Sequence, residues 1–134
     1  MMRLFARMST LLIACMGASM GWGAVAHAQD RGHALFNEHC APCHGPRGDG
    51  QGELSYLLYP SPRDLTRGSY KFRSTRSGEA PTAQDLLRTI TNGIPGTSMP
   101  SWSSFPESDR QLLVGVVQSF APRRFARPAR PIAL

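Results

Sequence analysis

The sequence predicts an all-α fold in one small domain. Two stretches in the second half of the chain carry apolar residues at helical spacing between helix start and stop signals, and a shorter amphipathic stretch lies around residue 35. The alternating pattern of a half-buried β-strand does not occur. The 134 residues, 41% of them hydrophobic and 18% charged, have the length and composition of one globular domain.

The first 28 residues have the composition of a secretory signal. Arg3 and Arg7 precede an apolar run over residues 8–25, and the segment ends in small residues. We expect residues 1–28 to be a signal peptide that is cleaved on export, which places the mature protein in the bacterial periplasm. Two alternatives remain open: the run could stay as a membrane anchor facing the periplasm, or the lipoprotein-like sequence ending at Cys15 could be lipidated.

The formal charge of +6 comes from 15 basic and 9 acidic residues. An excess of this size favours docking to an acidic protein surface or to an anionic membrane face. The basic residues do not form a stripe interleaved with aromatic residues, so we expect no nucleic-acid binding.

The first helix is predicted over residues 30–40, where Leu35 and Phe36 supply an inward face. Residues 45–52 are rich in glycine, which predicts a tight loop. Residues 53–81 contain too many prolines and polar residues for a long helix, and we expect them to be mostly loop with one short helical turn.

Two further helices are predicted in the second half of the chain. One covers residues 83–91, with Thr82 as its N-cap and Gly93 just beyond its end. The other begins with a capping-box pattern at Ser108, carries an apolar stripe at helical spacing and stops before Pro122.

These elements set the predicted domain boundaries. Residues 29–121 form the folded domain. Residues 122–134 are rich in arginine and proline, and we expect them to be an extended, disordered tail.

Cys40, Cys43 and His44 form a Cys-x-x-Cys-His motif directly after the first predicted helix. Two thiols at this spacing on one helical turn can reach the two vinyl groups of a haem, and the adjacent imidazole then points at the iron. The motif therefore predicts one covalently attached haem c per chain, with thioether bonds at Cys40 and Cys43 and with His44 as the proximal iron ligand.

Two other uses of the motif remain open. Cys-Ala-Pro-Cys also resembles the active site of thioredoxin-like dithiol proteins, although that fold needs a strand before the first cysteine. A structural zinc site would need four ligands, and His33 and His39 lie just ahead of the motif with no second ligand pair downstream in the sequence.

The second iron ligand must approach the haem face opposite His44. His33 and His39 lie on the helix that carries the cysteines, so either could reach that face only if the helix refolded. Met99 lies in a proline-containing loop far downstream, which is long enough to wrap around a haem edge. We expect Met99 to be the distal ligand; the alternative is that it fills the core.

Over nearly its whole length, the mature chain resembles the class I cytochromes c, a family of monohaem proteins with exported bacterial members. The resemblance rests on the Cys-x-x-Cys-His motif, on Gly32 and Phe36 spaced as in the family's first helix, on the Gly-x-x-Met-Pro segment ending at Pro100, and on the hydrophobic last helix. It implies a small cytochrome c fold of about three to four helices wrapped around one covalently bound haem.

The resemblance also implies how the first and last helices meet. Gly32 and Phe36 would form a close crossing with Leu113, Val116 or Val117 opposite. Glycine permits such an approach because it has no side chain.

Further site residues follow from the resemblance. A loop proline carbonyl would accept the imidazole N–H of His44, with Pro62 as the first candidate and Pro60 as the second. Arg73 and Trp102 would contact the haem propionates.

An iron held by one imidazole and one thioether has no open position for a substrate, so the predicted site suits electron transfer rather than catalysis. We expect a carrier or cytochrome subunit that passes single electrons to or from a larger periplasmic or membrane redox enzyme, which would present an acidic docking surface. A different class stays open: if Met99 is not bound, the iron could take a gas or a peroxide, and the protein would be a sensor or a weak peroxidase.

Overall fold

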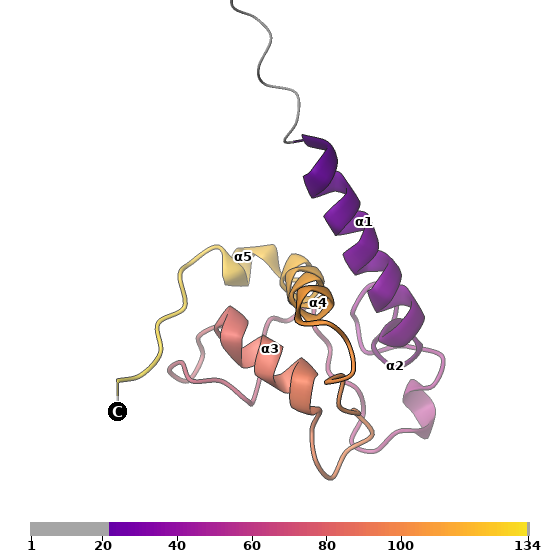
Figure 1. The fold of residues 1–134 in the computed structure, drawn as a ribbon. Helices are drawn as coiled ribbons and strands as arrows, with labels where there is room; N and C mark the ends of the chain where they lie inside the picture. The colour runs from indigo at the N-terminus through magenta and orange to yellow at the C-terminus, as the bar shows by residue number, and fades with distance from the viewer. Residues whose placement is uncertain (1–21, 134) are drawn as a thin grey trace, which may run out of the picture.

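The computed structural model describes residues 22–133, and within this range the chain is helical without a named strand (Figure 1). The predicted all-α class is confirmed. In the same range no helix combines the length and the hydropathy that crossing a membrane requires. The elements run in the order α1 (Trp22–His39), α2 (Ala41–His44), the 3-10 turn η1 (Ser55–Leu57), α3 (Ala83–Asn92), α4 (Glu107–Ser119) and α5 (Pro122–Phe125).

α1 begins earlier than the sequence predicted, at Trp22 instead of near residue 30. Its first turns overlap the end of the predicted signal peptide, and the rest of that peptide, Cys15 included, lies outside the described residues. Cleavage at the end of residues 1–28 would shorten α1 and stays a prediction.

α1 and α4 cross closely at Gly32. A Cβ atom added there would lie 3.1 Å from Cγ2 of Val116 and 3.3 Å from Cβ of Leu112, so a larger side chain would push the helices apart. Phe36 follows one turn later; it is 1% exposed, and its ring centroid lies 5.0 Å from that of Phe120. These contacts confirm the predicted role of Gly32 and Phe36 at the helix crossing.

An ion pair ties the two helices together beside this crossing. Arg31 donates from Nε to Oδ1 of Asp109 over 2.9 Å and from Nη2 to Oδ2 over 2.7 Å. The hydrogen bond from Arg31 lowers the pKa of the Asp109 carboxyl below its ordinary value. This two-pronged contact fixes the first turn of α4 against α1.

α3 begins at the predicted cap. The hydroxyl of Thr82 accepts the backbone N–H of Asp85, and the carboxylate of Asp85 accepts the backbone N–H of Thr82. Asp85 also accepts the backbone N–H and the hydroxyl of Ser74, which binds the preceding loop to the start of the helix. Burial alone would raise the pKa of Asp85, but the hydrogen bonds from Ser74 and Thr82 lower it below its ordinary value.

The start of α4 corrects the sequence prediction. The helix begins at Glu107 with Pro106 as its N-cap and without a side-chain cap, so the predicted capping box at Ser108 is wrong. Ser108 lies inside the first turn, and Gln111 donates to Glu107 over 3.0 Å instead. Glu107 and Asp109 place negative charge at this end, which complements the helix dipole without a hydroxyl cap.

The segment after α4 differs from the disordered tail that the sequence predicted. It starts with α5, where the Phe125 ring packs against Tyr70 at a centroid distance of 6.1 Å. Farther on, the backbone N–H of Ile132 donates to the carbonyl of Ser74 over 2.8 Å. The prolines of this segment make it extended, but the long-range contacts hold it on the domain.

Replacing Gly32 with valine should destabilise the protein by about 1–3 kcal/mol, because the added atoms would overlap α4 at the crossing. Urea unfolding followed by circular dichroism measures the change. Gly115→Ala is the matched control: apart from its chain neighbours and the backbone of its own helix, no atom of the described residues lies within 4 Å of a Cβ built there, so alanine should stabilise α4 by about 0.5–1 kcal/mol. Equal effects of the two substitutions would contradict the close crossing.

Candidate functional site

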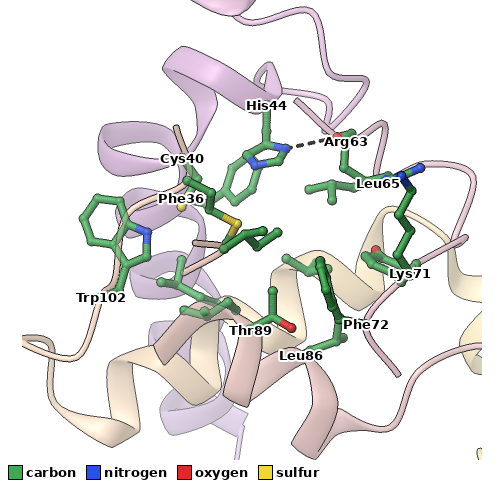
Figure 2. Close-up of a pocket in the computed structure, with 16 residues that line it drawn as sticks. Phe36, Cys40, His44, Arg63, Leu65, Lys71, Phe72, Leu86, Thr89 and Trp102 are labelled. Atoms are coloured by element: carbon green, nitrogen blue, oxygen red, sulfur yellow. Dashed lines mark hydrogen bonds between the residues drawn. The ribbon is translucent and has the colours of Figure 1, made fainter. Parts of the chain in front are cut away.

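A large apolar cavity lies between the helices and the loops that follow them (Figure 2). About 810 Å³ of space free of protein atoms lies within it, including the part open to solvent. Its walls come from α1, α2, α3, α4 and the loops between them. The lining residues are Phe36, Cys40, His44, Arg63, Leu65, Tyr70, Lys71, Phe72, Leu86, Thr89, Ile90, Ile94, Met99, Trp102, Leu113 and Val117.

The cysteine motif forms one helical turn at the edge of this cavity. The backbone N–H groups of Cys43 and His44 both donate to the carbonyl of Cys40, over 3.1 and 2.8 Å. Cys40 and His44 line the cavity, and Cys43 lines the hollow that continues from it. Both cysteines are free, and burial together with the neighbouring Cys43 raises the pKa of Cys40 to about 11. A helix precedes Cys40 here, where a thioredoxin-like dithiol site would need a strand.

The ring of His44 is fixed by a backbone carbonyl, but the acceptor is Arg63 and not Pro62. Nδ1 of His44 lies 3.0 Å from the carbonyl oxygen of Arg63 (Figure 2). The carbonyl of Pro62 faces Gly50 instead, where an added Cβ would come within 2.9 Å of it. Burial lowers the pKa of His44, so the ring is neutral and can donate from Nδ1 while Nε2 stays free for a metal. The prediction of Pro62, and of Pro60 as second candidate, is therefore wrong.

Met99 reaches the same cavity as His44 from the loop after α3. Its carbonyl accepts the N–H of Ile94 over 3.1 Å, and its own N–H donates to the hydroxyl of Thr97 over 3.2 Å. Gly93 has a φ of 66°, and a Cβ there would lie 2.6 Å from the carbonyl carbon of Pro100, so glycine lets the loop fold back on itself. The loop is thus held by its own hydrogen bonds with Met99 facing inward.

Trp102 lines the cavity, and His39 packs beside it. The predicted contact of Trp102 with a haem propionate stays a prediction. The His39 ring lies 5.5 Å from the Trp102 ring and 5.0 Å from that of Phe105, measured between centroids. His33 is exposed on α1 and does not line the cavity. The structure therefore brings Met99, and neither of these histidines, into the main cavity with His44.

Arg73 does not reach the cavity, which corrects its predicted contact with a propionate. Its guanidinium donates to the backbone carbonyls of Tyr70 and Arg76. The cavity is lined instead by Arg63, Lys71 and Tyr70, which the sequence analysis missed. The sequence signal for them is weak, because scattered cations in a loop are ordinarily solvated surface residues.

One polar group in this region lacks a partner. The hydroxyl of Tyr70 is buried and makes no hydrogen bond to any of residues 22–133. Burial raises its pKa to about 12, while the nearby charge of Arg63 acts in the opposite direction. A buried hydroxyl left unpaired costs about 1–3 kcal/mol, so a missing acceptor is expected here.

The donor set of the cavity fits a haem. The thiols of Cys40 and Cys43, the imidazole of His44 and the thioether of Met99 lie around a space with apolar walls, which suits the haem macrocycle. Tyr70, Arg63 and Lys71 offer hydrogen-bond donors and positive charge for the two haem carboxylates.

Comparison with known proteins agrees with this arrangement. The family described as cytochrome C oxidase, cbb3-type, subunit III, matches residues 27–115. The cbb3-type cytochrome c oxidase subunit CcoP of Azospirillum brasilense is 35% identical over 78 residues, which is 58% of this chain and 23% of that protein. A chain of the reducing HAO-like protein complex of Kuenenia stuttgartiensis superimposes with a TM-score of 0.74 at 40% identity, covering 78% of this chain and 48% of the other.

This protein therefore spans about a quarter of the length of the curated relative and about half of the matched solved chain. Its predicted resemblance to c-type cytochromes is confirmed. The family model covers most of the described residues, and the two candidate iron ligands, His44 and Met99, line one cavity. The chain therefore belongs to the c-type cytochrome family described as cytochrome C oxidase, cbb3-type, subunit III.

Proposed function

We propose that this protein is a monohaem c-type cytochrome that passes single electrons to or from a larger periplasmic or membrane redox enzyme, as a mobile carrier or as a cytochrome subunit, and is not itself an enzyme. The observation that carries the proposal is the meeting of Cys40, His44 and Met99 in one apolar cavity. The relatives are described as an oxidase subunit and as part of a reducing complex, which supports a role inside a redox assembly.

The chain's own residues would hold and insulate the cofactor. One covalently bound haem c supplies a one-electron Fe(III)/Fe(II) couple. Cys40 and Cys43 would anchor it through thioether bonds and His44 would bind the iron, while the Arg63 carbonyl keeps the His44 ring in place. Met99 would supply the second ligand to the iron, so that no position would stay open for a substrate.

The apolar centre and the polar end of the cavity would contact different parts of the haem. Apolar side chains from α3 and α4 exclude water from the centre, which together with the thioether favours the ferrous state. At the polar end, Tyr70, Arg63 and Lys71 would bind the haem carboxylates, and Trp102 adds an indole N–H near the cavity wall.

The docking surface for the redox partner would surround the mouth of the cavity. Lys71 and Arg63 line both the main cavity and its outer hollow, and none of the residues lining that hollow is acidic. The nearby turn η1 and the residues after it expose large apolar groups, with Tyr56 82% and Tyr59 93% accessible. A partner with an apolar patch rimmed by acidic groups complements this surface.

Export fits this role, because covalent haem attachment and the proposed partner both belong to the periplasm. We place the protein there, either released from its signal or held at the membrane by an uncleaved or lipidated N-terminus.

In the haem-loaded protein, Met99→Ala should abolish the weak long-wavelength absorption of a sulfur-ligated ferric haem, lower the reduction potential and open the iron to carbon monoxide. Optical spectra, potentiometry and carbon monoxide titration measure these changes. His33→Gln is the control and should keep the wild-type spectrum, because His33 is exposed on α1 and lines neither the main cavity nor its outer hollow.

A long-wavelength band that survives in Met99→Ala would move the distal ligand elsewhere. Carbon monoxide binding by the wild type at neutral pH would favour the sensor or peroxidase class. Loss of all haem from the wild type on denaturing electrophoresis would return Cys40 and Cys43 to a dithiol or zinc site.

Tyr70→Phe should lower the free energy of unfolding of the haem-loaded protein by about 0.5–1.5 kcal/mol, because the buried hydroxyl would lose its bond to a haem carboxylate. Guanidinium unfolding gives the difference, and the exposed Tyr56→Phe is the matched control, with no expected effect. If Tyr70→Phe is neutral or stabilising, the hydroxyl has no partner in the loaded protein either.

Lys71→Gln should slow oxidation of the reduced protein by ferricyanide about two- to fivefold at low ionic strength, because one positive charge leaves the mouth of the cavity. Stopped-flow rates at increasing salt should converge with those of the wild type. Arg123→Gln, on α5, is the charge-matched control. A salt-independent difference, or an equal effect of both variants, would place the docking surface elsewhere.

A further inference from the structure

One wall of the haem cavity is an irregular loop, residues 68–78. Three consecutive residues in it, Tyr70, Lys71 and Phe72, line the cavity, and Phe72 is 58% exposed at its mouth (Figure 2). A loop of this length without regular structure opens at low free energy unless other parts of the chain hold it. Its hydrogen bonds to α3 come from Ser74, whose backbone N–H and hydroxyl both donate to Asp85.

The segment after α4 touches this loop near its start. Gly68, at a φ of 58°, packs so closely that an added Cβ would lie 2.7 Å from Cγ of Arg124 and 3.0 Å from Cβ of Ala121. The rings of Tyr70 and Phe125 lie 6.1 Å apart between centroids. The cavity residue Tyr70 therefore has the C-terminal segment as its outer support.

The same segment contacts the second half of the loop. Nη2 of Arg124 donates to the carbonyl of Gly78 over 2.6 Å. Farther along, Pro131 forms an antiparallel bridge with Thr75, and the N–H of Ile132 donates to the carbonyl of Ser74 over 2.8 Å. In Figure 1 the C-terminal chain runs back past the loop that leads into α3. The contacts are thus spread over the whole loop.

From this geometry we propose that residues 121–133 are a strap that holds loop 68–78 as the outer wall of the haem cavity, with Arg124 and Phe125 as its positioning residues. The inference rests on the proposed function, since it concerns access to the haem. The strap lies beyond residue 115, where the family match ends.

The strap acts on the haem through water. A loosened loop lets Tyr70, Lys71 and Phe72 move outward and admits solvent to the cavity. Water stabilises the more highly charged ferric state, so the reduction potential falls as exposure rises. Neither Arg124 nor Phe125 lines the cavity, and the loop is a cavity wall that both of them contact.

The test uses the full-length, haem-loaded protein and two variants, Arg124→Ala and Phe125→Ala. Amide hydrogen exchange of residues 70–76 should speed up about five- to tenfold in each, while exchange in α1 and α4 stays unchanged. Potentiometry should show the equilibrium between Fe(II) and Fe(III) shifted about two- to tenfold toward Fe(III). Arg124→Lys and Phe125→Leu should restore most of both readouts.

Arg127→Ala is the matched control, because this exposed arginine belongs to the same segment and makes no hydrogen bond or ion pair within the described residues. Unchanged exchange of residues 70–76 in Arg124→Ala, or a change no larger than that in Arg127→Ala, would overturn the strap. Arg124 is at the surface, so its variants keep the test valid even if Phe125→Ala unfolds. Absence of covalent haem in the wild type would contradict the proposed function, whereas the exchange readout would still decide the strap.

Discussion

The constraint on which this structure depends is an apolar core closed around a space that the chain does not fill. Side chains of the core also form the cavity wall, so packing and cofactor binding use the same atoms. A void leaves its lining without dispersion contacts, and a domain this small has little other core to compensate. Haem binding and folding are therefore coupled. The shared residues are Phe36, Leu65, Leu86, Ile90, Leu113 and Val117.

The crossing of α1 and α4 determines the position of the Cys-x-x-Cys-His motif. Gly32 brings α1 against α4, and the Arg31–Asp109 pair locks that position. Because α1 leads directly into Cys40, the crossing also fixes the start of the turn that carries Cys40, Cys43 and His44. From the other side the carbonyl of Arg63 holds the ring of His44, so the turn is clamped between a helix pair and a loop.

The loops around the core make one end of the cavity polar and accessible. The interior is apolar, the loop carrying Tyr70 and Lys71 contributes the polar end, and the C-terminal strap supports that loop from outside. Positive charge and exposed aromatic rings meet at the mouth of the cavity, which is where an electron would enter or leave. An insulated centre with one accessible face is what a carrier between larger redox proteins requires.

Sequence patterns alone predicted the all-α class, the position of α3 and the Cys-x-x-Cys-His motif, and they pointed to Met99, which lines the cavity. These features follow from periodicity, caps and motif spacing, which are local. Which carbonyl meets His44 depends on the tertiary fold: the carbonyl oxygen of Arg63 lies 3.0 Å from Nδ1 of His44, whereas the carbonyl of Pro62 packs close to Gly50. In the folded chain Arg73 also bonds to backbone carbonyls outside the cavity, and the hydroxyl of Tyr70 has no partner within the described residues. The C-terminal residues pack on the domain. These features depend on contacts between segments that are far apart in the chain. Composition and local spacing do not determine which of several similar residues makes such a contact.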